Sequence, residues 1–227
     1  MLEAEIVHSM NEYLRCHGIS YANELRMGLG IPDISFNLGG NRKIRYIDDY
    51  YLLTVWDFID TQKKTTLKEI GARFYFSMEK VKKYVFELVK INLVTVRDEV
   101  VKAVNSIKNA RLGVTVAVEA KIRDWKKGLI QAQRYLFFSD YSYLALPKMN
   151  IRLVDKDALE EAGIGLLAID NKCLEEIIPA QKSNECTYYM KYMHTSVLFD
   201  QYKKNNDRYV RKKDHIFTHL AFENEQQ

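Results

Sequence analysis

The tripeptide Glu119-Ala120-Lys121 carries the residue types best suited to chemistry in this chain. Its first two residues end the run 113–120, GVTVAVEA, and Lys121 follows directly. The β-branched residues of this run predict an inner β-strand. Side chains two positions apart on a strand project from the same face, so Glu119 and Lys121 would lie together at its rim. A carboxylate and an ammonium placed there can bind a metal ion and hold a polarised water. A simple strand-end ion pair is the alternative.

A second carboxylate, Asp33, follows Pro32 at the start of another predicted strand. Apolar residues at 34, 36 and 38 alternate with Ser35 and Asn37, and this alternation predicts a strand with one buried face. Two carboxylates that converge from separate strands supply the oxygen ligands that Mg²⁺ requires. The alternative for Asp33 is a turn or cap residue.

In this order, and with the helix that follows, these motifs resemble those of the PD-(D/E)xK nuclease superfamily. Residues 131–135 read QAQRY on a helix predicted over 124–138, which is similar to the QxxxY motif of the RecB-type branch. The resemblance covers residues 1–40 and 113–170. It implies an α/β, restriction-endonuclease-like core with a central mixed sheet flanked by helices. It also implies hydrolysis of phosphodiester bonds with Mg²⁺ or Mn²⁺ and no organic cofactor.

Each matched residue takes an implied role from this resemblance. The two strand carboxylates and the Ala120 carbonyl would ligate the cation, and Glu24 would be a further ligand or an ordinary helix-end acid. Lys121 would orient the attacking water or stabilise the phosphate. The two helix residues would position the metal or a phosphate, or would simply pack. The implied catalytic residues are Asp33, Glu119, Lys121, Gln131 and Tyr135, and the implied metal ligands are Glu24, Asp33, Glu119 and Ala120.

The block between the two carboxylates is far longer than the short hairpin usual in that family, and it has a pattern of its own. Helical periodicity begins near residue 46, a capping box at Thr66 and Glu69 begins a second helix, and Ser77 begins a third. Two β-prone pieces follow, at 93–96 and 99–102. Three helices and a hairpin, in this order, predict a winged helix-turn-helix.

The patterns divide the chain into four parts. We expect a first core segment (1–45), an inserted winged helix-turn-helix (46–110), a second core segment (111–170) and a helical, basic C-terminal extension (171–227). In the extension, the run 203–213 reads KKNNDRYVRKK, with six basic residues and one acid. It can meet phosphates or form a solvated helix face. The tyrosines of the extension could supply a homodimer interface or close the core.

The third helix of the inserted block is the candidate for contact with nucleic acid. In a winged helix this helix enters the major groove and the hairpin touches the backbone. Lysines favour phosphate contacts over base readout, so sequence specificity is not implied. Protein contact is the alternative, because Glu79 and Glu87 dilute the positive charge. The implied nucleic-acid-binding residues are Arg73, Tyr75, Lys80, Lys82, Lys83 and Arg97.

The composition sets the broad class. The chain has 227 residues, a formal net charge of +4 and three cysteines. These cysteines are too few and too scattered for a disulfide framework or a zinc cage, and we interpret them as reduced thiols. No stretch approaches the roughly 20 apolar residues of a membrane span, and no signal peptide opens the chain. We therefore expect a soluble, cytoplasmic protein with no membrane partner.

The leading functional interpretation is a metal-dependent DNA endonuclease with an inserted winged helix, and a homodimer is the arrangement that would let it cut both strands of a duplex. One alternative is a non-catalytic nucleic-acid-binding or regulatory protein on the same scaffold, since a fold does not dictate a function. A protein-interaction module is the other. DNA binding that ignores a chelator would favour the first alternative, and a lack of salt-dependent DNA affinity would favour the second.

Overall fold

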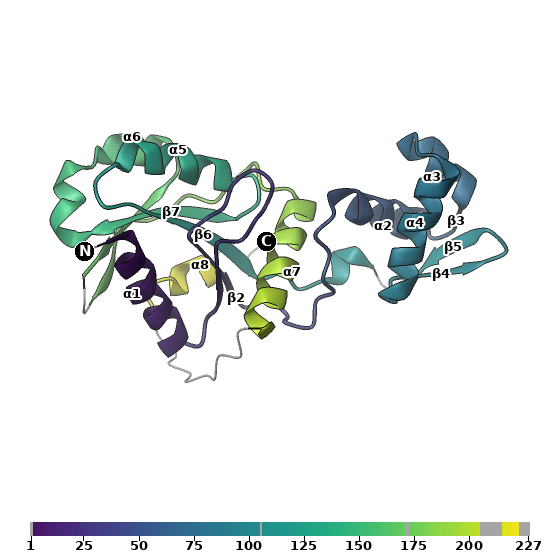
Figure 1. Ribbon diagram of the computed structural model, residues 1–227, viewed down its shortest axis with the longest axis horizontal. Helices are drawn as coiled ribbons and strands as arrows, with labels where there is room; N and C mark the ends of the chain where they lie inside the picture. The colour runs from purple at the N-terminus through teal and green to yellow at the C-terminus, as the bar shows by residue number, and fades with distance from the viewer. Residues whose placement is uncertain (1, 105, 171–172, 205–214, 223–227) are drawn as a thin grey trace. The chain divides into compact units, whose positions relative to one another are not determined.

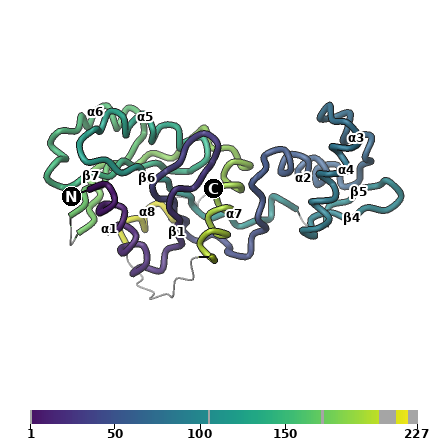
Figure 2. Tube along the Cα trace, viewed as in Figure 1, coloured from purple at the N-terminus to yellow at the C-terminus, as the bar shows by residue number. Residues whose placement is uncertain are grey.

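The computed structural model describes residues 2–104, 106–170, 173–204 and 215–222. The chain forms two compact units, one made of Met1–Tyr46 with Leu112–Gln227 and the other of Ile47–Arg111. Figure 1 shows their secondary structure. In Figure 2 the chain can be followed out of the first unit after Tyr46 and back into it at Leu112. The block expected at 46–110 corresponds in extent to the second unit.

A six-stranded mixed sheet is the centre of the first unit, with the strand order β1-β2-β6-β7-β8-β9. Strands β6, β7 and β8 are parallel to one another, and the remaining neighbours pair antiparallel. The mixed sheet between helices confirms the predicted α/β class. The strands are β1 (Ser20–Asn23), β2 (Ile34–Leu38), β6 (Val114–Ala120), β7 (Tyr141–Pro147), β8 (Gly165–Ile169) and β9 (Leu174–Ile178).

Helices cover both faces of this sheet (Figure 1). Helix α1 (Glu3–Cys16) and the short α8 (Thr218–Phe222) share one hydrophobic cluster with the strands. Helices α5 (Trp125–Tyr135) and α6 (Lys156–Glu161) belong to a second cluster on the other face. Helix α7 (Tyr188–Lys204) packs against β1 and β2, and a 3₁₀ helix, η2 (Lys148–Leu153), follows β7.

The alternation of side chains along β6 decides where the candidate site lies. Val116, Val118 and Ala120 belong to the cluster beneath α1. Glu119 therefore projects from the opposite face, the one that α5 covers. On the antiparallel neighbour β2, Ile34 and Phe36 also face the α1 cluster, so Asp33 shares the face of Glu119. The prediction of an inner strand over 113–120 is confirmed, because β6 lies between β2 and β7.

Strand β2 differs from its prediction. All five of its residues are buried, not one face alone. The reason is that α1 covers one side while α7 packs on the other. The polar Asn37 tolerates this burial because its amide donates to the Leu112 carbonyl (2.8 Å) and accepts from the Gly40 N–H (2.9 Å). Strand β1 is a further strand of the sheet, one that the sequence patterns do not predict.

The segment after residue 170 also differs from its prediction as a helical extension. Strand β9 pairs antiparallel with β8 at the edge of the main sheet, so the extension is not wholly helical. Helix α7 is packed into the first unit, where its Leu198 and Phe199 are buried. Tyr192 and Tyr202 are buried too, and they close the core. Of the basic run 203–213, only the first two lysines lie within the described residues, and Tyr209 lies outside them.

The second unit contains three helices and a three-stranded antiparallel sheet of order β3-β5-β4. The predicted helix starts are confirmed: Thr66 and Glu69 form a capping box, and the Ser77 side chain accepts from the Lys80 N–H. Its elements are α2 (Tyr50–Gln62), β3 (Thr65–Thr66), α3 (Leu67–Phe74), α4 (Met78–Lys90), β4 (Val94–Arg97), β5 (Val100–Ala103) and η1 (Ile107–Asn109). Its helices bury Trp56, Ile70 and Val81.

Two features of the whole sequence can be checked in the described residues. Within them, none of the helices is both long and apolar enough to cross a membrane. All three cysteines carry free thiols, which agrees with their interpretation as reduced.

Candidate functional site

Asp33 and Glu119 lie beside each other because of the register between β2 and β6. Ile34 pairs with Val118 in the antiparallel ladder, so the preceding Asp33 stands opposite Glu119. The Oδ2 atom of Asp33 accepts a hydrogen bond of 2.7 Å from the Ala120 N–H. The two carboxylates expected to converge from separate strands are thus neighbours at one edge of the sheet.

Glu119 is the centre of a buried cluster of polar side chains. Its exposed fraction is only 2%, and that of the Lys121 side chain is 11%. The Lys121 ammonium pairs with one carboxylate oxygen of Glu119, and the Tyr135 hydroxyl of α5 donates to the other. The ammonium also donates to the Ala120 carbonyl (3.1 Å). The sequence prediction that Glu119 and Lys121 share a face is confirmed, and the pair is buried, unlike an ordinary surface ion pair.

Burial makes both carboxylates weaker acids than usual. Desolvation raises the pKa of Asp33, against the Ala120 hydrogen bond and the Lys121 charge, which lower it. Desolvation likewise raises the pKa of Glu119, while the hydrogen bonds from Lys121 and Tyr135 oppose the rise and the charge of Asp33 adds to it. Two acids that share one ammonium in a partly dry site repel each other. Their raised pKa values are typical of functional sites, although ion-pair networks also produce them.

The ammonium and the phenol of the cluster keep their protons. Desolvation lowers the pKa of Lys121, but the hydrogen bond and charge of Glu119 outweigh it, so the pKa lies above its usual value. Burial and the Glu119 carboxylate also raise the pKa of Tyr135. Lys121 therefore contributes a positive charge, and Tyr135 contributes a neutral hydrogen-bond donor.

A loop from β1 to β2 covers the Tyr135 side of the cluster. The Ile31 carbonyl lies 3.1 Å from the Tyr135 hydroxyl. Gly30 lies so close to the Tyr135 ring that a Cβ there would stand 2.7 Å from a ring carbon. Glu24 is exposed at the start of this loop, with a φ of +51° and its N–H 3.3 Å from the Asp33 carbonyl. It follows β1, so its interpretation as a helix-end acid is wrong.

Glu3 is an acid near the site that the sequence motifs do not identify. It lies in the first turn of α1, and its charge acts on both Asp33 and Lys121. Glu24 also acts on Asp33 through its charge. The available signal was the position of Glu3 at the start of an amphipathic helix, which does not reveal where that end of the helix docks.

The oxygen donors at this edge match a hard cation in type. Two carboxylates and the Ala120 carbonyl come from adjacent strands, and Mg²⁺ prefers such ligands. Gln131 stands one turn before Tyr135 on α5, and its Oε1 is buried without a hydrogen-bond partner among the described residues. In the arrangement described, however, no three His, Cys, Asp or Glu side chains of the described residues are grouped closely enough to hold a metal. The donor chemistry fits a cation, and the side-chain positions place the Lys121 ammonium against Glu119.

In the second unit, the candidate nucleic-acid-binding side chains are exposed. Tyr75 follows α3 in the left-handed conformation and is 96% exposed. Lys82 and Lys83 project from α4 away from its buried stripe, which includes Val81 and Leu88. Lys80 differs from them, because its ammonium lies 3.9 Å from the centre of the Phe76 ring and so makes a cation–π contact. Arg73 lies in the last turn of α3, and Arg97 ends β4.

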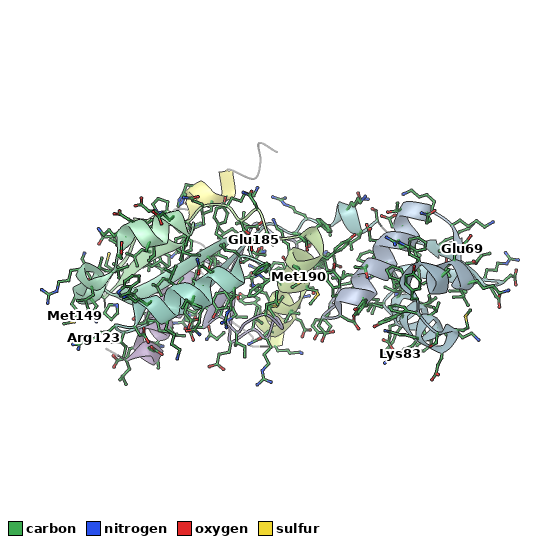
Figure 3. All side chains as sticks on the ribbon, turned by 90° about the horizontal axis from the view of Figure 1, so that it is seen from above. Glu69, Lys83, Arg123, Met149, Glu185 and Met190 are labelled. Carbon is green, nitrogen blue, oxygen red and sulfur yellow. The ribbon has the colours of Figure 1, made fainter. Side chains whose placement is uncertain are left out.

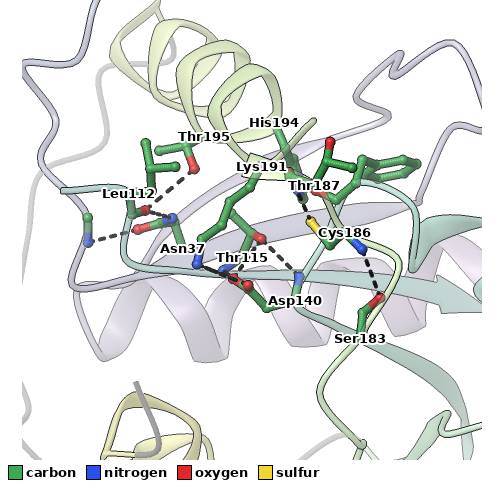
Figure 4. A network of polar contacts seen from close by, with 12 residues as sticks. Asn37, Leu112, Thr115, Asp140, Ser183, Cys186, Thr187, Lys191, His194 and Thr195 are labelled. Atoms are coloured by element: carbon green, nitrogen blue, oxygen red, sulfur yellow. Dashed lines mark hydrogen bonds and ion pairs between the residues drawn. The ribbon is translucent and has the colours of Figure 1, made fainter. Parts of the chain in front are cut away.

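A second polar network ties α7 to the sheet (Figure 4). The Asp140 carboxylate accepts from the Thr115 N–H (2.8 Å) and pairs with the Lys191 ammonium (2.8 Å). His194 is fully buried next to it, with its Nδ1 3.0 Å from the Phe138 carbonyl. Burial lowers the pKa of His194 to about 4. Because these groups bond to one another and to backbone, we interpret the network as structural.

A cavity of about 330 Å³ lies elsewhere in the first unit. It is lined by residues of α1, among them Tyr13 and His17, and by Ile169, Asp170 and Leu174 near the turn between β8 and β9. None of its lining residues belongs to the set predicted from the sequence. Polar groups and register, rather than cavity size, therefore identify the carboxylate edge as the candidate site.

Comparison with known proteins adds little to this geometry. No family model matches the sequence, and no curated protein matches it significantly. Among solved structures, a protein of unknown function from Silicibacter pomeroyi is similar over 40% of this chain, with 19% identity and a TM-score of 0.29. The match covers 57% of that protein, so this chain spans little more than half of its length. At this TM-score, the likeness identifies neither a fold family nor a function.

Proposed function

We propose that this protein is a metal-dependent DNA endonuclease with a restriction-endonuclease-like core. The observation that carries the proposal is the convergence of Asp33, Glu119 and Lys121 at one sheet edge, against Tyr135 of the next helix. Three separate sequence segments contribute to this cluster, and each contributes the residue type that phosphodiester hydrolysis requires. A lone Glu-x-Lys motif often occurs by chance, whereas a spatial combination of all these residues is a much more specific signal.

The chemistry follows from the charges of the site. A divalent cation held by Asp33, Glu119 and the Ala120 carbonyl would neutralise phosphate charge and acidify water. With a cation held beside Glu119, the Lys121 ammonium, which pairs with Glu119 in this structure, would be available to contact a phosphate oxygen or the attacking water. A protonated lysine stabilises negative charge that develops on the phosphate. Tyr135 keeps its hydroxyl proton and orients the Glu119 carboxylate.

The second unit fits the proposal as a winged helix-turn-helix. Its order of three helices followed by a hairpin agrees with that class, and α4 presents Lys82 and Lys83 on its outer side. Lysine side chains bind phosphates without reading bases. The proposed role is therefore to hold DNA in a sequence-independent way, with Tyr75 and Arg97 at the periphery of the contact.

One observation favours a second candidate, a non-catalytic nucleic-acid-binding protein on the same scaffold. Both carboxylate oxygens of Glu119 already have partners, and Asp33 accepts from backbone. A cluster satisfied in this way can be purely structural, since buried polar groups are normally hydrogen-bonded. In that case DNA binding would be insensitive to chelator and no cleavage would occur.

The test is cleavage of plasmid and branched DNA with Mg²⁺ or Mn²⁺. Glu119→Gln and Lys121→Met each remove one charge with little change in shape, and both are expected to abolish cleavage. Removing one partner of a buried ion pair destabilises a protein by about 3–5 kcal/mol, because the other charge stays buried without a partner. The double variant Glu119→Gln/Lys121→Met is therefore included, because it removes both charges together. The matched controls are Glu12→Gln and Arg15→Met, which break an exposed ion pair on α1 and keep activity.

Cleavage that survives in the folded double variant would overturn the proposed site. A wild-type protein that binds DNA but cleaves none of these substrates with either metal would favour the non-catalytic candidate. Circular dichroism of every variant separates loss of chemistry from loss of fold.

A further inference from the structure

The loop between β1 and β2 displays apolar side chains next to the polar cluster. Leu29 and Ile31 are each 50% exposed, whereas Leu25 and Met27 of the same loop are buried. The buried side chains are enough to anchor the loop in the first unit. Folding of this unit therefore does not explain why two further aliphatic side chains are held in solvent at this place.

The loop backbone holds these side chains in fixed positions. The Met27 N–H bonds to the Gly30 carbonyl (3.2 Å), which closes a tight turn with Leu29 at its tip. Gly30 packs against the Tyr135 ring, and the Ile31 carbonyl lies 3.1 Å from the Tyr135 hydroxyl. The same hydroxyl donates to Glu119. One phenol thus connects the apolar loop directly to the carboxylate cluster.

Two basic side chains accompany the loop and the cluster. Arg26 in the loop and Arg123, two residues after Lys121, are both exposed. The Asn150 amide donates to the Ile122 carbonyl (2.7 Å), which brings η2 to the same edge. Figure 3 shows Arg123 and Met149, which is 75% exposed, at the same end of the first unit. Exposed basic and apolar side chains are therefore both present on the loop and on the segments that follow β6 and β7.

Nucleic acid presents its largest apolar surfaces on the faces of its bases. In a continuous duplex these faces are stacked, so a protein meets phosphates, sugars and base edges, whose apolar parts, such as the thymine methyl group, are small. Side chains such as Leu and Ile gain contact with base faces where the stack is opened, as they do when they wedge between base steps. Against an undisturbed duplex, Leu29 and Ile31 would meet only these small apolar patches, a smaller contact than an unstacked base face offers.

We propose that Leu29 and Ile31 contact unstacked bases, so that the substrate is DNA with an unpaired or distorted step at the cleavage site. This inference rests on the proposed function, because it names the substrate class of the same site. Unstacking a regular duplex costs a few kcal/mol per base step. The loop therefore selects DNA whose bases are already unstacked, such as a flap or a branch.

The test is equilibrium binding with Ca²⁺ in place of Mg²⁺, using a 5′-flap DNA and a duplex of the same sequence. Each carries 2-aminopurine at one of several positions around the junction, because its fluorescence rises on unstacking. Wild type is expected to prefer the flap and to raise the fluorescence at one position. The double variant Leu29→Ser/Ile31→Ser loses that rise and binds the flap about ten-fold more weakly, as expected from the loss of two half-buried aliphatic contacts.

Salt dependence identifies the kind of contact that is lost. Apolar contacts release no counterions, so the double variant keeps the wild-type slope of log affinity against log salt. Ile130→Ser is the matched control, because Ile130 is 54% exposed on α5 and belongs to no proposed contact. It is expected to behave like wild type in fluorescence and affinity.

Two results would overturn the inference and can be told apart. If wild type binds flap and duplex equally, with no change in 2-aminopurine fluorescence at any position, the loop does not contact bases and the endonuclease proposal stands. If wild type binds neither DNA even at low salt, the proposed function fails as well.

Discussion

Acidification is expected to destabilise this protein through a single buried histidine. His194 lies on α7 with no exposed surface, its Nδ1 against the Phe138 carbonyl and its ring edge-on to the Phe138 ring. Its Nε2 has no hydrogen-bond partner among the described residues. A charge on this imidazole would be buried with no carboxylate in direct contact, so burial lowers the pKa from 6.5 to about 4.

The size and sign of the effect follow from linkage. The unfolded chain protonates His194 below about pH 6.5, whereas the folded chain protonates it only below about pH 4. Between these values the unfolded state binds one more proton, so the free energy of unfolding falls as the pH falls. Each pKa unit corresponds to about 1.4 kcal/mol, which gives a loss of about 2–3 kcal/mol between about pH 7.5 and about pH 4.5.

The assay is urea unfolding followed by fluorescence and circular dichroism at a series of pH values. His194→Asn keeps an amide donor for the Phe138 carbonyl and removes the titrating group. This variant is expected to lose about 2–3 kcal/mol less stability than wild type on acidification. Leu198→Ala is the control, because it destabilises α7 through its buried core without removing a histidine and keeps the wild-type pH slope.

Equal slopes for wild type and His194→Asn would refute the reasoning. They would mean that the imidazole charges in the folded state at little cost, through water or a shift of α7. The Asp140–Lys191 pair next to it has compensating charges and would not produce such a difference between the two proteins.

Three further perturbations test other parts of the structure. Lys191→Met removes the cation from the buried Asp140 carboxylate and is expected to lower the free energy of unfolding, measured in urea, by about 3 kcal/mol. Adding Asp140→Asn to this variant is expected to restore part of that loss. Unchanged stability of Lys191→Met would contradict a buried pair. Thr66→Ala removes the cap of α3 and is expected to cost about 1 kcal/mol in thermal unfolding, whereas Thr54→Ala inside α2 costs less. Lys82→Ala/Lys83→Ala is expected to reduce the salt slope of DNA binding by about 2, and an unchanged slope would remove α4 from the DNA contact.

Strong local patterns made much of the fold predictable from the sequence. The β-branched run that ends at Ala120 forms β6, an inner strand, as its composition indicates. The side-chain caps at Thr66 and Ser77 begin helices because they satisfy backbone N–H groups locally, whatever the tertiary structure. Glu119 and Lys121 could be paired from spacing alone, since a strand has a period of two.

Features decided by distant contacts were not predictable. Strand β9 reads LEEII, a short charged segment whose two ends are buried only because β8 accepts it as an edge partner. Burial of α7 depends on β1 and β2, which lie far earlier in the chain. Glu3 reaches the site only because of how α1 crosses the sheet. The pairing of Tyr135 with Glu119 also required the register of α5 against β6.

The charge balance of the cluster argues that stability alone did not select it. The buried Glu119 and the half-buried Asp33 face one ammonium, and Glu3 and Glu24 add further negative charge nearby. A buried ion pair is often no more stable than well-packed apolar residues of the same volume, and an excess acid makes it less so. Local rules of stability are broken mainly where a function requires it. A divalent cation, or a positive group of equivalent charge, is the ligand that would remove the excess, and this favours the proposal of a metal-dependent site at this edge of the sheet.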